Sequence, residues 1–290
     1  MSAAISVPVV EAVLAEAEAT LAAARVGTPR ADAEWLLAGI LNVGRTALAV
    51  NARCPLGAPN AERYDDAVRR RARREPLQRI LGWEEFRGLR FRLTPDVLIP
   101  RPETELLVEW ALGLLPAPVA GHRTRAIDVG TGSGCIACAL AHDRRDVAVS
   151  AIDVSGSTAA VARGNADVLG VDVGVVVADL VTATAAASVD LLVANLPYLP
   201  EALIGELAPE VTEHEPRLAL AGGADGLDVI RRFIPDARRV LRRAGAVVLE
   251  TLGTAQAQTV GGLLAEVGFV DVVTRDDLAG ITRYVAGRRP

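Results

Sequence analysis

The chain has 290 residues, of which 51% are hydrophobic and 23% are charged, and this composition indicates a globular protein of about two domains with a large core. Its formal net charge of −5 does not favour direct binding to nucleic acid, and because all 31 lysine-or-arginine positions hold arginine, lysine Schiff-base chemistry is excluded. No apolar run reaches the ~18 residues of a membrane span, and the N-terminus lacks the basic start of a signal peptide, so we expect a cytoplasmic protein without membrane contact.

Residues 6–82 are predicted to form helices. Apolar residues recur at helical spacing through Val13, Leu14 and Leu21, and Pro29 after Thr28 is typical of the start of a second helix. A third helix, predicted over residues 61–75, carries the arginine run Arg69, Arg70, Arg71, Arg73 and Arg74. We expect most of this run to form a solvated face; the alternative is a contact patch for an acidic or ribosome-associated partner.

Residues 86–105 are predicted to connect this helical region to the rest of the chain. Residues 86–93 alternate around a glycine, which predicts a hairpin. Two prolines flank Arg101 and stiffen the backbone, after which a helix opens at Glu103 and runs to Leu114. The domain junction is therefore expected in this stretch.

From Arg125 onward the pattern changes to alternating strands and helices. Strands are expected over residues 125–129, 147–152, 173–177, 189–194, 246–250, 269–273 and 281–285, and helices over 135–142, 157–169, 227–243 and 256–267. This alternation predicts an α/β fold with a doubly wound sheet covered by helices on both faces. Cys135 and Cys138 fall in an apolar helix, where we expect them to pack rather than bind a metal or form a redox pair.

The tetrapeptide Asn195-Leu196-Pro197-Tyr198 follows an apolar strand that should lie inside the sheet. Pro197 cannot donate to a sheet ladder and ends the strand, and ligands of such sheets bind at the carboxyl ends of the strands. The side-chain carbonyl of Asn195 and the backbone carbonyl of Leu196 could accept both N–H bonds of a planar amine. Tyr198 could stack on the flat face of that group. The pattern indicates a site that aligns the nitrogen of an amide or an adenine for attack on an electrophile.

A glycine-rich loop at the end of residues 125–129 is a candidate cofactor site. The loop comprises Asp128, Val129, Gly130, Thr131, Gly132, Ser133 and Gly134. Glycines let the backbone approach a ligand closely, and Asp128 would suit an ammonium group, directly or through water. Asp153, after the next strand, could accept both ribose hydroxyls, and Asp179 could accept from an adenine amino group. A ligand with these three parts is S-adenosylmethionine.

These motifs resemble the HemK/PrmC family of protein-(glutamine-N5) methyltransferases over nearly the whole chain. The similar stretches are residues 75–82, 98–105, 128–134, 195–198 and 215–227, and the Pro-Arg-Pro-Glu-Thr-Glu run from Pro100 to Glu105 is the most specific of them. The resemblance implies a Rossmann-like class I S-adenosylmethionine-dependent methyltransferase with an antiparallel last strand. It also implies a helical substrate-docking domain at 1–84, a hairpin linker at 85–100 and a methyltransferase domain at 101–290.

The resemblance further implies the substrate and the site. The substrate would be the glutamine of the Gly-Gly-Gln motif in peptide chain release factors, S-adenosylhomocysteine the product, and the chain a monomer with no metal. Residues Gly130 to Gly134 and Asp153 would hold the cofactor, and Asn195 to Tyr198 the glutamine amide. The adenine would lie between Asp179 and Leu180, and the methionine end beside Arg101 and Thr104.

This sequence departs from the family pattern at two positions, and other functions stay open. Leu196 replaces the usual first proline of Asn-Pro-Pro-Tyr, and Leu180 stands where an aromatic residue is common. The alternatives are an adenine-N6 nucleic-acid methyltransferase, a paralogue that modifies another protein glutamine, and a binding module without activity. For an enzyme we expect direct in-line transfer of the methyl group without a covalent enzyme intermediate.

Overall fold

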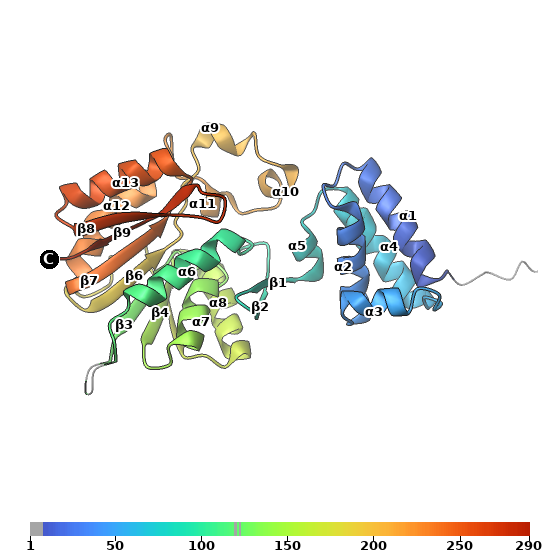
Figure 1. Cartoon of the computed structure of the whole chain (residues 1–290), viewed down its shortest axis with the longest axis horizontal. Coiled ribbons are helices and arrows are strands. Elements are labelled where there is room, and N and C mark those ends of the chain that lie inside the picture. Colours follow the sequence, from blue (N-terminus) through green and yellow to red (C-terminus); the bar gives the residue numbers. More distant parts are fainter. Residues whose placement is uncertain (1–7, 119–120, 122) are drawn as a thin grey trace, which may run out of the picture. The chain divides into compact units, whose positions relative to one another are not determined.

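The computed structural model describes residues 8–118, 121 and 123–290, which fall into two compact units (Figure 1). The first unit contains the chain up to Gly82 together with Ala208–His214, and the second contains Trp83–Leu207 and Glu215–Pro290. The domain limits 1–84, 85–100 and 101–290 stay predictions, and residues 1–7 of the first lie outside the described residues.

The first unit is helical, as the spacing of its apolar residues predicts. Its helices are α1 (Val10–Ala23), α2 (Pro29–Leu41), α3 (Arg45–Val50), α4 (Ala58–Ala72), α5 (Leu77–Leu81) and α10 (Pro209–Thr212). Leu21, Leu36 and Leu37 are fully buried in its core. The buried Tyr64 hydroxyl donates a hydrogen bond to the Ala33 carbonyl at 3.1 Å, so α4 and α2 are joined by a polar contact as well as by packing.

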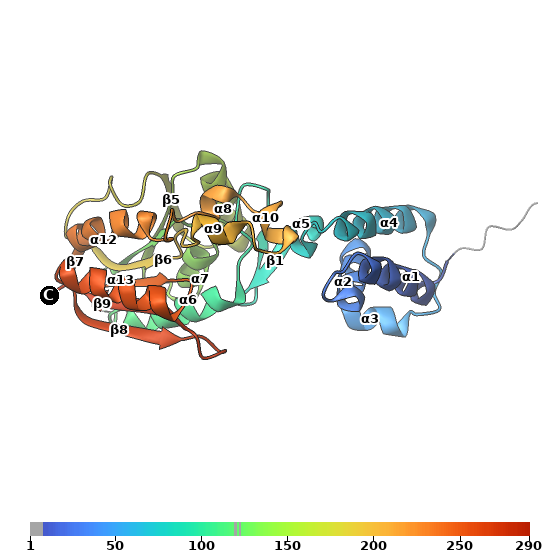
Figure 2. The same cartoon turned by 90° about the horizontal axis from the view of Figure 1, so that it is seen from above.

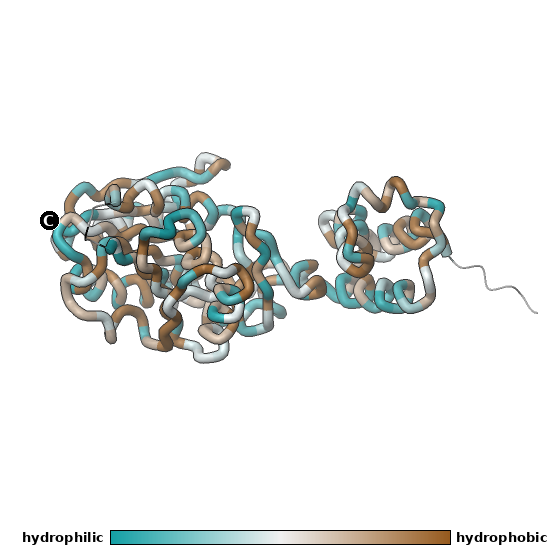
Figure 3. Tube along the Cα trace, turned by 90° about the horizontal axis from the view of Figure 1, so that it is seen from below, coloured by the Kyte–Doolittle hydropathy of each residue, from teal (hydrophilic) through white to brown (hydrophobic). Residues whose placement is uncertain are grey.

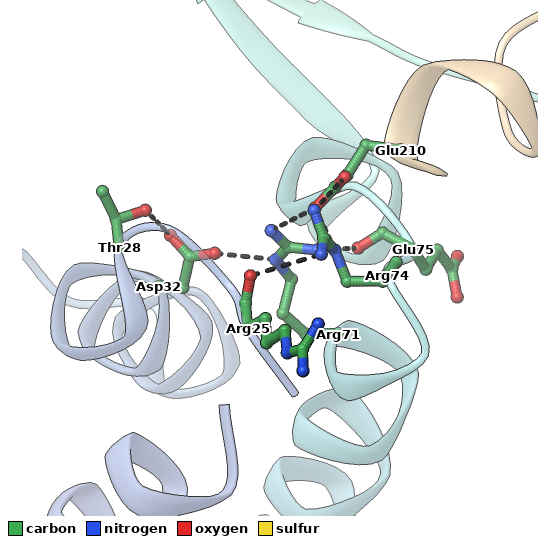
Figure 4. A network of polar contacts seen from close by, with 7 residues as sticks. All are labelled: Arg25, Thr28, Asp32, Arg71, Arg74, Glu75 and Glu210. Atoms are coloured by element: carbon green, nitrogen blue, oxygen red, sulfur yellow. Dashed lines mark hydrogen bonds and ion pairs between the residues drawn. The ribbon is translucent and has the colours of Figure 1, made fainter. Parts of the chain in front are cut away.

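Arg69, Arg70 and Arg71 of the arginine run lie on α4, which is hydrophilic along most of its length (teal in Figure 3). Arg73 and Arg74 follow the end of the helix at Ala72, so the helix predicted over residues 61–75 is too long at its C-terminal end. The predicted solvated face is nevertheless wrong for Arg71, which is only 6% exposed. Its Nε donates to Asp32 Oδ2 at 2.7 Å, and its Nη1 donates to the Glu75 carbonyl at 3.1 Å (Figure 4). Asp32 is itself buried, and a buried carboxylate needs such a charged partner.

Glu210 ties the segment Ala208–His214 to this unit. Its Oε1 accepts a hydrogen bond from Arg71 Nη2 at 2.9 Å. Arg74 adds a two-pronged contact, from Nε to Oε1 and from Nη2 to Oε2, both at 2.7 Å (Figure 4). Nothing in the local sequence around Glu210 indicates this attachment, because its partners lie far away along the chain.

Glu210 should make the first unit sensitive to acid. Burial raises the pKa of Glu210, but hydrogen bonds from Arg74, its own backbone amide and Arg71 outweigh this and lower it from 4.5 to about 2. Because the pKa is lower in the folded than in the unfolded chain, this stabilisation is complete above pH 4.5 and is lost as the pH falls towards 2. Between pH 5 and pH 3 the loss should be about 2 kcal/mol.

Glu210→Gln is the variant that tests this pH dependence. A glutamine keeps the size of the side chain but does not titrate, so its variant should lose about 2 kcal/mol less than the wild type between these pH values. Urea-dependent hydrogen exchange of the α2 and α4 amides, followed by mass spectrometry, measures the free energy of opening at each pH. Equal losses in the two proteins would contradict the prediction.

The second unit is built on a sheet of seven strands. In spatial order they are β5 (Val173–Val177), β4 (Ala148–Asp153), β3 (Arg125–Val129), β6 (Val189–Ala194), β7 (Leu241–Glu250), β9 (Thr282–Arg288) and β8 (Val270–Asp276). The strands from β5 to β7 run parallel, whereas β9 is antiparallel to both of its neighbours. The predicted doubly wound sheet with an antiparallel last strand is confirmed.

Helices cover both faces of this sheet (Figure 1). One face carries α6 (Pro102–Leu114), α7 (Cys135–Asp143) and α8 (Gly156–Leu169), and on the other face α12 (Asp228–Val240) and α13 (Thr254–Glu266) lie side by side (Figure 2). Along β3, Ala126 packs in the first layer and Ile127 in the second, as expected for a strand buried on both faces. Cys135 and Cys138 are free thiols buried in α7.

The predicted helix over 227–243 is too long at its C-terminal end. α12 ends at Val240, because Leu241 has an extended backbone (φ −63°, ψ 144°) and pairs with Val189 of β6. Arg242 Nη1 then bonds both carboxylate oxygens of Asp190, at 3.1 and 3.0 Å. A partner on the neighbouring strand therefore overrides the helical pattern in these residues.

The remaining elements are short. The predicted hairpin is formed by β1 (Trp83–Phe86) and β2 (Leu89–Arg92), which pair in antiparallel fashion. α9 (Glu201–Ile204) and α11 (Arg217–Leu220) lie in the stretch between β6 and α12. Within the described part of the chain, none of the helices combines the length and the apolar character that crossing a membrane requires.

Candidate active site

A pocket of about 580 Å³ opens at the carboxyl ends of β3, β4, β5 and β6. β3 has β4 on one side and β6 on the other, so the strand order reverses there, and this is the position where open α/β sheets bind ligands. The predicted site residues that line the pocket are Gly130, Gly132, Asp153, Asp179, Leu180, Asn195, Leu196 and Pro197. The predicted residues outside its lining are Arg101, Thr104, Asp128, Thr131, Ser133, Gly134 and Tyr198.

The glycine loop after β3 has a backbone that favours glycine. Gly130, Gly132 and Gly134 all have positive φ, at 73°, 56° and 83°. A Cβ at Gly134 would also lie 3.1 Å from the Cα of Ala162 in α8, so the loop and this helix pack too closely for a side chain. Gly132 faces open space instead, and a ligand can approach its backbone closely.

Asp128 lies fully buried beneath this loop. Its Oδ2 accepts hydrogen bonds from Thr131 Oγ1 at 2.6 Å and from the Ala137 amide at 3.1 Å. Burial raises the pKa of Asp128 to about 7, against the opposing effect of these two bonds. Among the described residues Oδ1 has no hydrogen-bond partner, which fits the predicted attraction for an ammonium group. Asp128 does not line the pocket, so its predicted attraction for an ammonium group stays a prediction, and it would have to act through the loop or through water.

Asp153 is held at the end of β4 by two backbone amides. Its Oδ1 accepts from the Ser155 amide at 3.0 Å and its Oδ2 from the Gly132 amide at 3.1 Å. Burial raises the pKa of Asp153 overall, although these bonds lower it. Each oxygen keeps a second lone pair, so the carboxylate can accept two further hydrogen bonds, as a ribose requires.

Asp179 and its neighbours line another part of the pocket. Asp179 is exposed and forms an ion pair with Arg232 of α12, a partner that the sequence analysis missed. Leu180 is buried and has a positive φ of 51°. Val229 and Leu218 add apolar lining, so this part suits a flat, weakly polar group such as a purine.

Asn195 presents a free acceptor to the pocket. Its Nδ2 donates to Thr104 Oγ1 at 3.0 Å, which leaves the side-chain carbonyl pointing elsewhere. No donor in the described chain reaches Asn195 Oδ1 or the Leu196 carbonyl oxygen. Both residues line the pocket, and a planar –NH2 group bound there would need two acceptors of this kind.

Tyr198 is anchored at both ends. Its hydroxyl donates to Glu250 Oε1 at 3.1 Å, and its carbonyl accepts from Gln256 Nε2 at 3.0 Å. Burial raises the pKa of Tyr198, so the hydroxyl keeps its proton. Glu250 is a site residue that was not predicted from the sequence. It lies at the carboxyl end of β7 after a buried apolar run, and an acidic residue in that position was the available signal.

Arg101 and Thr104 lie at the start of α6. Arg101 Nη2 bonds Glu215 Oε1 at 3.2 Å, and Thr104 Oγ1 donates to Glu250 Oε2 at 2.8 Å. Their assignment to the methionine end of the cofactor stays a prediction.

Comparisons with known proteins agree with this architecture. The model of the PrmC N-terminal domain matches residues 12–82, and the model of the methyltransferase small domain matches residues 104–207. The release factor glutamine methyltransferase of Geobacter sulfurreducens is 43% identical over 268 residues, covering 92% of each chain. The enzyme of that name from Mycolicibacterium smegmatis is 40% identical over 281 residues, covering 94% of this chain and 95% of the relative.

Solved structures add support for the fold alone. A methyltransferase from Pyrococcus furiosus aligns with a TM-score of 0.52 and 15% identity, covering 70% of this chain and 90% of its own. The catalytic domain of hMettl16 aligns with a TM-score of 0.56 and 18% identity, covering 83% and 86%.

Proposed function

The chain belongs to the release factor glutamine methyltransferase family, and from this premise we propose that it methylates the side-chain nitrogen of the glutamine in the Gly-Gly-Gln motif of peptide chain release factors. The methyl donor is S-adenosylmethionine, and the products are N5-methylglutamine, S-adenosylhomocysteine and a proton, which leaves the amide nitrogen. The observation that carries the proposal is a pair of carbonyl oxygens without a donor among the described residues, on Asn195 and Leu196, two residues that line the same pocket as Asp153 and the glycine loop.

The pocket has the parts that S-adenosylmethionine requires. Asp153 would accept the ribose hydroxyls, Leu180 and Asp179 would flank the adenine, and Gly132 leaves room beside the backbone. The unpartnered Oδ1 of Asp128 would favour the ammonium group. When bound, S-adenosylmethionine supplies an electrophilic methyl carbon, and the electrons of its bond to sulfur stay on the sulfur atom when the methyl group is transferred.

The residues of this chain contribute alignment rather than a strong base. An amide nitrogen is a poor nucleophile because its lone pair is delocalised into the carbonyl group. Asn195 Oδ1 and the Leu196 carbonyl would accept its two N–H bonds and fix the direction of the lone pair, while Tyr198 supports the flat face. Fixed acceptors of this kind act through positioning and through preorganised electrostatics.

The proposal also assigns roles to the two units and a location. The helical unit that contains α1 to α5 docks the release factor, and the sheet unit carries out the transfer. We place the reaction in the cytoplasm, with the chain acting as a monomer.

The direct test is methylation of a purified release factor. Incubation with S-adenosylmethionine should add one methyl group to the glutamine of the Gly-Gly-Gln motif, as located by tandem mass spectrometry. A release factor with that glutamine replaced by asparagine is the matched control and should stay unmodified. Methylation of adenine in RNA, with the release factor left unmodified, would contradict the proposal.

Asp153→Ala should weaken cofactor binding. The variant removes the carboxylate that would accept two ribose hydroxyls, and hydrogen bonds to a charged group are strong, so the Kd of S-adenosylhomocysteine should rise about 10–100-fold. Isothermal titration calorimetry measures this constant. Asp172→Ala removes an exposed carboxylate outside the pocket and is the control, with unchanged affinity expected. Equal affinity in the wild type and Asp153→Ala would remove Asp153 from the cofactor site.

A further inference from the structure

A chain of hydrogen bonds runs beneath the pocket from Asn195 to Tyr198 through two buried residues. Asn195 Nδ2 donates to Thr104 Oγ1 at 3.0 Å, and Thr104 Oγ1 donates to Glu250 Oε2 at 2.8 Å. The Tyr198 hydroxyl donates to the other oxygen of the same carboxylate at 3.1 Å. Thr104 and Glu250 are each 2% exposed, and neither lines the pocket.

When Glu250 is ionised, only one order of donors and acceptors satisfies every bond in this chain. Burial raises the pKa of Glu250 to about 7, so this order is the prevailing one above that pH. A carboxylate has no proton to give, so it only accepts. Thr104 has one hydroxyl proton, and giving it to Glu250 leaves its oxygen able only to accept. The partner that faces Thr104 must therefore be a donor, and the –NH2 end of the Asn195 amide is that donor.

This order decides which end of the Asn195 amide faces the pocket. With its –NH2 group held by Thr104, Asn195 turns its carbonyl oxygen towards the ligand. If Thr104 were free to donate to Asn195, the amide could turn over and present –NH2 instead. Two –NH2 groups that face each other are both donors and cannot form a hydrogen bond. The glutamine –NH2 group of the substrate would then lose the Asn195 carbonyl oxygen as its acceptor.

We infer that Glu250 is a positioning residue that acts through Thr104 to keep the carbonyl end of Asn195 facing the substrate amide. The inference rests on the proposed function, because it is the glutamine nitrogen that needs the acceptor. Glu250 also accepts from the Tyr198 hydroxyl, so one buried carboxylate holds the side chain of Tyr198 directly and that of Asn195 through Thr104.

Thr104→Val and Glu250→Gln break this order in different ways. Valine has the shape of threonine but neither donates nor accepts. Glutamine can donate to Thr104, which frees the threonine hydroxyl to donate to Asn195. Each variant should lower kcat on the release factor about 10–100-fold, the range seen when outer hydrogen-bond partners of metal ligands are removed. The KM for the release factor should change less than about threefold in both variants, because Asn195 and Leu196 stay in place. In Glu250→Gln, which lies outside the predicted cofactor residues, the Kd of S-adenosylhomocysteine should also change less than about threefold.

Two controls separate positioning from a general loss of packing. Thr104→Ser keeps the hydroxyl and should recover kcat to within about threefold of the wild type. Thr251 is the residue next to Glu250, and its buried hydroxyl donates to the Arg283 carbonyl. Thr251→Val removes this hydroxyl and should leave kcat unchanged. The Arg283 carbonyl still accepts from the Thr251 amide, so this control leaves no unpaired group.

The double variant Thr104→Val/Glu250→Gln gives the decisive comparison. If both residues act through the single bond to Asn195, its kcat should fall no further than that of the worse single variant. Losses that multiply, a wild-type kcat in Thr104→Val, or an equal loss in Thr251→Val would overturn the inference while the proposed function stands. A wild-type chain that leaves the release factor glutamine unmodified would contradict both.

Discussion

Asn195→Ala is expected to lower kcat about 10²–10³-fold, the range measured when a hydrogen-bonding group that acts in the transition state is removed. Alanine removes the side-chain acceptor and leaves the Leu196 carbonyl as the remaining partner for the glutamine –NH2 group. The nitrogen lone pair is then free to turn away from the methyl carbon. Because Asp153 and the glycine loop are untouched, the Kd of S-adenosylhomocysteine should change less than about twofold.

Single-turnover kinetics on the release factor and calorimetry on the same preparation measure the two quantities. Gln258→Ala is the matched control, because it removes another side-chain amide of the second unit, exposed on α13, and should leave kcat unchanged. A normal rate of glutamine methylation in Asn195→Ala would show that this amide does not hold the substrate. A parallel loss of cofactor affinity would instead place Asn195 in the cofactor site.

The polar residues at the carboxyl ends of the strands could be predicted from the sequence, because the pattern that marks each of them is local. Asp153, Asp179 and Asn195 each follow a short apolar run, and parallel strands bring such positions to one edge of the sheet. The structure places all three around one pocket. The glycine loop could be predicted for the same reason, since three glycines within five residues indicate a backbone with positive φ angles, and the structure has them.

Thr104 and Glu250 show what such patterns cannot give. The two residues are 146 positions apart, and their contact depends on how α6 packs against the end of β7. In the sequence Glu250 is simply a charged residue after an apolar strand. Its hydrogen bonds to Thr104 and Tyr198 are properties of the packed fold, because they join side chains that are distant in the sequence.

The burial of Arg71, within an arginine run expected to be mostly solvated, could not be predicted for a related reason. Arg69 and Arg71 look alike in the sequence, yet the Arg69 side chain is 62% exposed and that of Arg71 is 8% exposed. The difference comes from Asp32 and Glu210, which lie 39 and 139 residues from Arg71. Composition alone assigns an arginine run to solvent, and tertiary partners decide which member is buried.

Arg71→Ala is expected to destabilise the first unit by about 3–5 kcal/mol, the cost of breaking a buried ion pair by removing one partner. Alanine leaves the Asp32 carboxylate buried, and among the residues that the structure describes its only remaining donor is the Thr28 hydroxyl. It also removes the donor to the Glu75 carbonyl and one of the two arginines that hold Glu210. The free energy of opening of the α2 amides, from hydrogen exchange in increasing urea, measures the effect.

Arg69→Ala is the matched control in the same helix. Its side chain is exposed, and within the described part of the chain it reaches only Asp66, at 3.5 Å, so its loss should cost less than about 0.5 kcal/mol. The double variant Asp32→Asn/Arg71→Met separates charge from packing, because it removes both buried charges and should be more stable than Arg71→Ala. If Arg71→Ala costs no more than Arg69→Ala, the buried pair contributes nothing to the unit. If the double variant is less stable than Arg71→Ala, the stability lost in Arg71→Ala comes from the missing packing of the Arg71 side chain and not from the unpaired charge of Asp32.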